Sequence, residues 1–217
     1  MLDTAAQRAN MVASQLRTND VRDPRICHAV QAVPREIFVP ERFRPVAYME
    51  STIEIARSRA LMDARCFGKL LQLAAIRPTD MVLDVGCGTG YSAVVMGMLA
   101  ARVFALECEE LLAAAAEVNI RTLEASTVEV VRGPLTDGDL THAPFDVILI
   151  EGAVEQRPSA LLEQLKDDGR LVAVKRNGAA SSGCIYLKHG SATSEREAFD
   201  AWLPVLPGFA RPREFTF

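Results

Sequence analysis

Hydrophobic and polar residues follow two different patterns along the chain. In the first third, apolar residues recur at helical spacing. This spacing predicts helices over residues 4–16, 25–33 and 64–76. Pro34 and Pro78 end the second and third helices, because proline disfavours the helical conformation of the residue before it. The intervening segment 38–55 has prolines and irregular alternation, which predicts loops and a short hairpin.

From Met81 onward, short apolar runs alternate with helical patterns. Strands are expected over residues 81–85, 102–107, 127–131, 145–150, 170–174 and 183–187. Helices are expected over residues 92–101, 109–123 and 158–166. This alternation predicts an α/β fold with a mostly parallel central sheet, and right-handed crossovers place helices on both faces. We expect residues 1–78 to form an N-terminal helical extension with a substrate-side segment, packed on a core of residues 79–217.

Composition narrows the class of protein. The 217 residues carry a formal net charge of -4 and 24% charged residues, so no overall positive field attracts nucleic acid or an anionic membrane. No apolar run approaches the roughly 20 residues that span a bilayer, and the N-terminus lacks the pattern of a signal peptide. Five scattered cysteines and three scattered histidines form no metal-ligand pattern. We expect a cytoplasmic protein, a monomer or weak homodimer, without a metal, a nucleic-acid partner or a membrane partner.

A glycine-rich loop follows the strand 81–85. Its glycines are Gly86, Gly88 and Gly90, and Asp84 precedes the first by two residues. Glycines permit a tight turn and close approach of a ligand to the backbone. A dinucleotide-binding fingerprint would need its third glycine where Tyr91 stands, so a nicotinamide dehydrogenase is disfavoured. The spacing G-x-G-x-G resembles motif I of class I S-adenosylmethionine-dependent methyltransferases, which have a Rossmann-like fold.

Glu107 supports a nucleotide-like ligand at this loop. It ends the next expected strand, 17 residues after Gly90. An acid at that place can accept hydrogen bonds from both hydroxyls of a ribose. The alternatives are a structural turn for the glycines and a solvated acid for Glu107.

Several segments resemble one family. The residues that carry the likeness are Met11–Arg17, Val33-Pro34-Arg35-Glu36-Ile37-Phe38-Val39-Pro40, Ala47-Tyr48, Ala143–Ile148, Gln164–Lys166 and Gly169–Val172. In this order they resemble the protein-L-isoaspartate (D-aspartate) O-methyltransferases, from about Met11 to about Val174. The resemblance implies S-adenosyl-L-methionine as cofactor, S-adenosyl-L-homocysteine as product, and damaged (isoaspartyl) proteins or peptides as substrate in a repair role. The cofactor contacts that it implies are Asp84, Gly86, Cys87, Gly88, Gly90, Glu107, Cys108, Pro134, Leu135 and Glu151.

The chain also departs from this family, as a divergent member would. The usual Gly-Gln-Thr-Ile-Ser segment is missing, and the positions of its hydroxyls fall on Ala60 and Met62. The Gly-Asp-Gly expected after the third strand reads Gly133-Pro134-Leu135, so its acid is absent; Asp137 and Asp139 are the alternatives.

Methyl transfer to a carboxylate does not need the lost hydroxyls as a base. A carboxylate with a pKa of about 4 is already ionised at neutral pH, so catalysis rests chiefly on alignment of the reactants. The catalytic candidates are Arg57, Arg59 and Glu151. The arginines either pair with an anionic acceptor or are solvated; Glu151 either stabilises the cofactor's sulfonium, acts as a base, or caps the next helix.

Three functions stay open at this point. The leading one is an S-adenosylmethionine-dependent methyltransferase of the isoaspartyl type with an altered active-site loop. The second is a methyltransferase with another acceptor, and the third is a cofactor-binding homologue without catalysis. In the C-terminal part, we expect Trp202, Phe209, Phe215 and Phe217 to pack in the core or at an edge, with a dimer contact as the alternative.

Overall fold

The computed structural model describes residues 3–212, and it begins with a helical region. Its elements are α1 (Thr4–Met11), a π-helical turn (Val12–Leu16), α2 (Pro24–Ala32), three 3-10 turns (Arg17–Asn19, Arg35–Phe38 and Glu41–Val46), and α3 (Ala64–Ala74). Each of the three α-helices has an aspartate at its N-cap whose side chain accepts a hydrogen bond from a backbone amide of the first turn. These helices confirm the predicted segments.

A small hairpin lies between the 3-10 turn Glu41–Val46 and α3. Its strands β1 (Ile53–Ala56) and β2 (Arg59–Leu61) pair antiparallel and form a two-stranded sheet of their own. The hairpin expected near residues 38–55 therefore exists but lies further along the chain than its predicted range.

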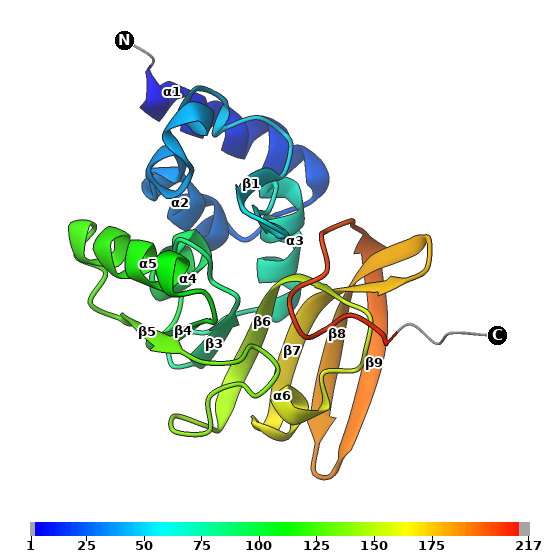
Figure 1. Cartoon of the computed structure of the whole chain (residues 1–217). Helices are drawn as coiled ribbons and strands as arrows, with labels where there is room; N and C mark the ends of the chain where they lie inside the picture. The colour runs from blue at the N-terminus through cyan, green and yellow to red at the C-terminus, as the bar shows by residue number, and fades with distance from the viewer. Residues whose placement is uncertain (1–2, 213–217) are drawn as a thin grey trace, which may run out of the picture.

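The central sheet has seven strands. They are β3 (Met81–Val85), β4 (Arg102–Glu107), β5 (Val128–Arg132), β6 (Phe145–Val154), β7 (Leu165–Asn177), β8 (Ala180–His189) and β9 (Ala192–Asp200). Their order across the sheet is β5-β4-β3-β6-β7-β8-β9 (Figure 1). The first five in this order pair in parallel, and β8 and β9 add antiparallel strands at one edge. The mostly parallel α/β sheet is thus confirmed.

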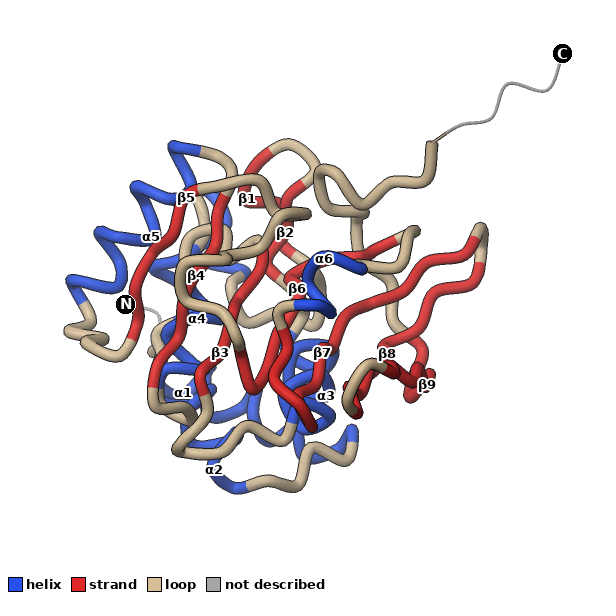
Figure 2. The backbone as a smooth tube through the Cα atoms, turned by 90° about the horizontal axis from the view of Figure 1, so that it is seen from below, coloured by secondary structure: helices blue, strands red, loops and turns tan. Residues whose placement is uncertain are grey.

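One face of the sheet carries the helices of the N-terminal region together with α4 (Tyr91–Gly97) and α5 (Glu110–Thr122). These helices and the strands share one continuous apolar core. Figure 2 shows the helices α1 to α5 on one side of the strands and α6 (Ser159–Glu163) on the other. This division follows from right-handed crossovers, because the chain moves toward β5 through α4 and α5 and toward β7 through α6.

The second face is covered mainly by irregular chain. Beside the short α6, the segment after β9 places Leu206 and Phe209 in a second apolar core. The prediction for Phe209 is therefore confirmed. Trp202 is 63% exposed, so it does not pack in the core; packing at an edge and a dimer contact stay predictions for this residue. Phe215 and Phe217 lie outside the described residues.

Apolar burial explains where the predicted boundaries succeed and fail. The predicted strands at β3 and β4 match the observed ones, since both are buried over nearly their whole length. The strand β9 was not predicted, because most of its side chains are exposed and polar at the sheet edge. Among residues 3–212, no helix combines the length and apolar character needed to cross a membrane.

Candidate functional site

The glycine loop lies at the carboxyl end of β3, in the centre of the parallel sheet. Gly86, Gly88 and Gly90 have φ angles of 81°, 58° and 94°, which non-glycine residues rarely adopt. Gly90 is the N-cap of α4, so the loop turns the chain directly from strand into helix. The predicted strand–loop–helix context of the motif is present at the edge of the sheet where ligands bind in such folds.

Glu107 ends β4, next to β3, and points its carboxylate at the loop. It is fully buried. Its Oε2 accepts a hydrogen bond from the Gly88 amide at 2.8 Å. Its Oε1 accepts from the amides of Cys108 and Glu109 at 2.8 and 3.0 Å. The backbone therefore holds this carboxylate in a fixed orientation, as expected for a residue that positions a ligand.

The partner of Glu107 is Arg59, which reaches the site from β2. Its Nη1 and Nη2 each donate to one oxygen of Glu107 at 2.6 Å, a bidentate charge-assisted arrangement. Nη2 also donates to the carbonyl oxygen of Gly86 at 3.0 Å. The Arg59 side chain is only 2% exposed. Arg59 is thus buried and directed at Glu107. The solvated alternative considered from the sequence is wrong for this residue, and its pairing with an acceptor stays a prediction.

The ion pair keeps both groups charged in spite of burial. Burial favours the neutral form of Glu107, but the hydrogen bonds and charge of Arg59, with the amides of Glu109 and Gly88, hold its pKa below the ordinary value. Burial opposes the charge of Arg59 as well, and Glu107 outweighs it and raises the pKa of Arg59.

Beside the Arg59–Glu107 ion pair, the site contains two further buried acids. Asp84, in β3, is fully buried, and Glu151, in β6, is 8% exposed. The Ser92 hydroxyl, from α4, donates to Asp84 Oδ2 at 2.6 Å. Asp84 Oδ1 and Glu151 Oε1 have no hydrogen-bond partner among the described residues. Two buried acceptors without donors fit a cationic or hydrogen-bonding ligand group.

Burial favours the protonated form of both acids. Burial raises the pKa of Asp84 to about 7. The hydrogen bond from Ser92 lowers this pKa, and the negative charge of Glu107 raises it. Burial, followed by the negative charge of Asp84, raises the pKa of Glu151 well above its ordinary value. Glu151 lies within an irregular part of β6, eight residues before α6 begins, so the expectation that it caps the next helix is wrong.

Arg35 was not singled out as a functional residue from the sequence. It is 1% exposed, and its guanidinium donates to the carbonyl oxygens of Ala47 and Met62. It also lies 5.0 Å from the centre of the Tyr91 ring. Arg35 Nη1 and the Tyr91 hydroxyl have no partner among the described residues. The signal that could have found it is its place in the Val-Pro-Arg-Glu segment.

Other predicted residues are placed as follows. Cys87 is buried and Cys108 is exposed beside Glu107. Leu135 is buried close to Gly86, whereas Pro134 is exposed.

Three candidates do not enter the loop site. Arg57 is exposed in the turn of the β1–β2 hairpin, and Asp137 is exposed as well. Asp139 is buried, but its two oxygens accept from the amide of Thr141 and contact the His142 ring. Asp139 is therefore bound within its own segment and does not replace the missing acid.

Apolar side chains complete the closure of the loop. A Cβ atom added to Gly88 would lie 2.6 Å from Ile55 of β1, and one added to Gly86 would lie 3.0 Å from Leu206. A Cβ atom on Gly152 would lie 2.5 Å from the same Leu206. The space beside the loop is thus filled by the hairpin and by the C-terminal segment.

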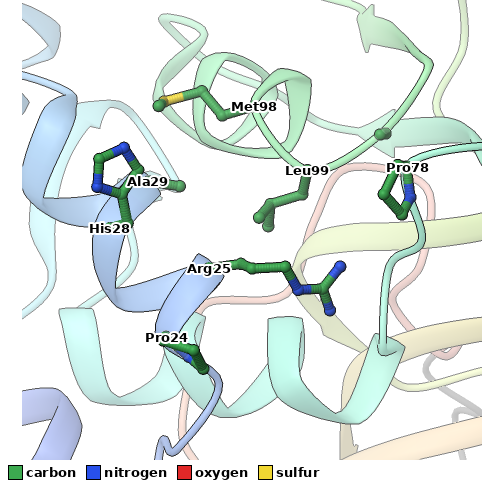
Figure 3. Close-up of a pocket in the computed structure, with 8 residues that line it drawn as sticks. Pro24, Arg25, His28, Ala29, Pro78, Met98 and Leu99 are labelled. Atoms are coloured by element: carbon green, nitrogen blue, oxygen red, sulfur yellow. The ribbon is translucent and has the colours of Figure 1, made fainter.

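A surface cavity of about 370 Å³ lies elsewhere, between α2 and the segments before β3 and β4 (Figure 3). Its lining includes His28, Pro78 and Leu99. Since the last two precede β3 and β4, the cavity lies at the amino ends of those strands, opposite the glycine loop. Arg25 on its wall already bonds to Asp23 and to the carbonyl of Ile76. Within residues 3–212, no three His, Cys, Asp or Glu side chains gather as metal ligands.

Comparison with known proteins gives the family. The family model of protein-L-isoaspartate(D-aspartate) O-methyltransferase (PCMT) matches residues 7–191. The chain belongs to this family. A protein-L-isoaspartate O-methyltransferase of Koribacter versatilis is 40% identical over 168 residues, which cover 77% of this chain and 76% of that protein. One of Roseiflexus castenholzii is 32% identical over 211 residues, 96% of both. The resemblance stated from the sequence is confirmed.

A solved structure supports the fold independently. The beta-aspartate methyltransferase (PCMT) of Plasmodium falciparum, in complex with S-adenosyl-L-homocysteine, superposes with a TM-score of 0.79 at 16% identity, over 92% of this chain and 97% of that one. The class I methyltransferase fold predicted from the glycine loop is therefore confirmed.

Proposed function

We propose that this protein binds S-adenosyl-L-methionine at the glycine loop and transfers its methyl group to isoaspartyl carboxylates of damaged proteins, releasing S-adenosyl-L-homocysteine. The observation that carries the proposal is the complete Asp84–Gly86–Gly88–Gly90 loop beside Glu107, in a chain of the PCMT family. The relatives named above bear this activity in their names.

The residues present fit such a cofactor at both of its ends. The carboxylate of Glu107 is of the kind that accepts the two hydroxyls of a ribose. The unpartnered oxygens of Asp84 and Glu151 are suited to the positive charge of the amino acid end. Cys108 and Leu135 flank the same site. The bound cofactor supplies an activated methyl group, so the protein needs to align it rather than to generate a nucleophile.

The protonation of Asp84 and Glu151 affects how strongly the site repels a negatively charged methyl acceptor. Because burial favours a proton on Glu151 or Asp84, the pair carries less negative charge at neutral pH than two free carboxylates. Repulsion of an isoaspartyl carboxylate by Glu151 is reduced accordingly. Arg57, exposed in the hairpin turn, stays a candidate for pairing with the acceptor only if the hairpin moves.

Two other functions have specific support. Closure of the loop by Arg59 favours a homologue that has lost catalysis, because the acid of the cofactor site is already paired. The missing hydroxyls at Ala60 and Met62, together with Glu151 as a potential base, favour a methyltransferase with another acceptor. In either case we propose a cytoplasmic monomer or weak homodimer, with residues 1–78 contributing the substrate side.

The test is methyl transfer from labelled S-adenosylmethionine to an isoaspartyl peptide, with the matching aspartyl peptide as control. Incorporation confined to the isoaspartyl peptide supports the proposal. Incorporation into proteins of a cell extract but not into the peptide favours another acceptor. Absence of incorporation into both favours the inactive homologue.

A further inference from the structure

The β1–β2 hairpin covers the glycine loop with two side chains. Arg59 of β2 contacts both Glu107 and the Gly86 carbonyl. Ile55 of β1 lies against Gly88, so closely that an added Cβ atom there would be 2.6 Å from its Cδ1. The hairpin is therefore seated directly on the surface that the cofactor would use.

Glu107 has no acceptor position left for another ligand while Arg59 is bound. A carboxylate offers about four lone-pair positions. Oε1 receives the Arg59 guanidinium and the amides of Cys108 and Glu109, and Oε2 receives the guanidinium and the amide of Gly88. Five donors thus surround two oxygens. Two of the five donors come from Arg59, one on each oxygen, and a ribose diol also brings two donors. The diol can therefore bond to Glu107 only in place of Arg59.

We propose that the β1–β2 hairpin is an autoinhibitory strap, in which Arg59 takes the place of the ribose diol on Glu107 and the cofactor binds only when Arg59 is withdrawn. This inference rests on the proposed function, because the competing ligand is the nucleoside end of S-adenosylmethionine. It adds that the chain itself regulates cofactor binding at that site.

The architecture allows the strap to move without breaking the central sheet. The hairpin forms a separate two-stranded sheet of four and three residues. Such small hairpins are only marginally stable by themselves. Its turn is exposed at Arg57 and Ser58, and Ser58 has a positive φ of 59°. The Arg59–Glu107 pair is the main polar link between this hairpin and the loop.

The strap has a measurable consequence for affinity. When only a fraction of molecules has an open site, the apparent dissociation constant is the intrinsic one divided by that fraction. Replacing Arg59 removes the internal competitor and raises the open fraction. Arg59→Gln is the informative variant, because glutamine stands at this position in the usual Gly-Gln-Thr-Ile-Ser segment and retains much of the side-chain length.

The experiment is calorimetric titration of S-adenosylhomocysteine into the wild type, Arg59→Gln and Arg59→Lys. The matched control is Arg57→Gln, which removes the same charge from the exposed turn of the same hairpin. We expect Arg59→Gln to bind about tenfold tighter or more, Arg59→Lys to fall between it and the wild type, and Arg57→Gln to match the wild type. Thermal unfolding of each variant verifies that it is folded.

The outcomes separate the strap from the proposed function. The strap proposal is wrong if Arg59→Gln is folded but binds no tighter than the wild type, or if Arg57→Gln gains as much affinity. This holds whatever the peptide assay shows. If Arg59→Gln binds tighter and no variant methylates the isoaspartyl peptide, the strap stands and the isoaspartyl activity fails. If neither the wild type nor folded Arg59→Gln binds, both proposals fail.

Discussion

At the scale of single residues, the buried ion pair decides how the site behaves. Arg59 and Glu107 are both shielded from water, and removing one partner of a buried pair leaves an uncompensated charge. Three backbone amides remain on Glu107, so its charge is not fully orphaned. The pair therefore couples stability to ligand access: the interaction that closes the site also stabilises the fold.

Arg59→Gln should lower the free energy of unfolding by about 3 kcal/mol, the low end for a broken buried pair. Urea unfolding at neutral pH measures the loss. Arg59→Met combined with Glu107→Gln should recover part of it, because no buried charge is left unpaired and the side-chain amide oxygen still accepts from the backbone amides. Unchanged stability of Arg59→Gln would show that the pair is not formed in solution.

Asp84 gives the protein a specific pH dependence. Burial raises its pKa from the ordinary value of 3.8 to about 7 in the folded chain. Between pH 3.8 and pH 7, the folded state therefore binds a proton that the unfolded state has released. The contribution of this proton to stability is present below about pH 4 and is lost as the pH rises through 7. Without ligand, the wild type should lose stability from pH 5 to pH 8 relative to Asp84→Asn, which keeps an acceptor for Ser92. Urea unfolding of both at each pH checks this, and parallel curves would contradict it.

At the scale of elements, the sequence predicted best what is buried and least what is exposed. The strands 81–85 and 102–107 are continuous apolar runs, and they match β3 and β4. The helix predicted over 158–166 is only Ser159–Glu163, because Leu165 already pairs with Phe145 as the start of β7. The polar edge strand β9 carried no periodic signal strong enough to predict it.

The C-terminal segment is an element without regular structure that nevertheless closes the second core. Phe209 is 3% exposed within that core. Phe209→Ala should therefore cost about 3–5 kcal/mol of unfolding free energy. Trp202→Ala is the matched control, since Trp202 is 63% exposed, and it should change stability by about 0.5 kcal/mol or less. Equal losses in the two variants would mean that the segment does not pack as described.

At the scale of the whole molecule, the site could be predicted from the sequence only in part. The loop and Glu107 follow from local spacing, because both lie at the ends of neighbouring parallel strands. The Arg59–Glu107 contact joins residues 48 positions apart and depends on how the hairpin folds back over the sheet. Arg35 is similar, since it bonds to the backbone carbonyls of Ala47 and Met62, which lie 12 and 27 positions further along the chain. Local patterns contain no information on such contacts.

The most direct single measurement is the rate of methyl transfer to an isoaspartyl peptide by the wild type and Arg59→Gln, at a low concentration of S-adenosylmethionine. The account predicts transfer that is specific for the isoaspartyl peptide in both proteins and faster in Arg59→Gln, because the cofactor site is open more often. Absence of isoaspartyl-specific transfer in both folded proteins would contradict it.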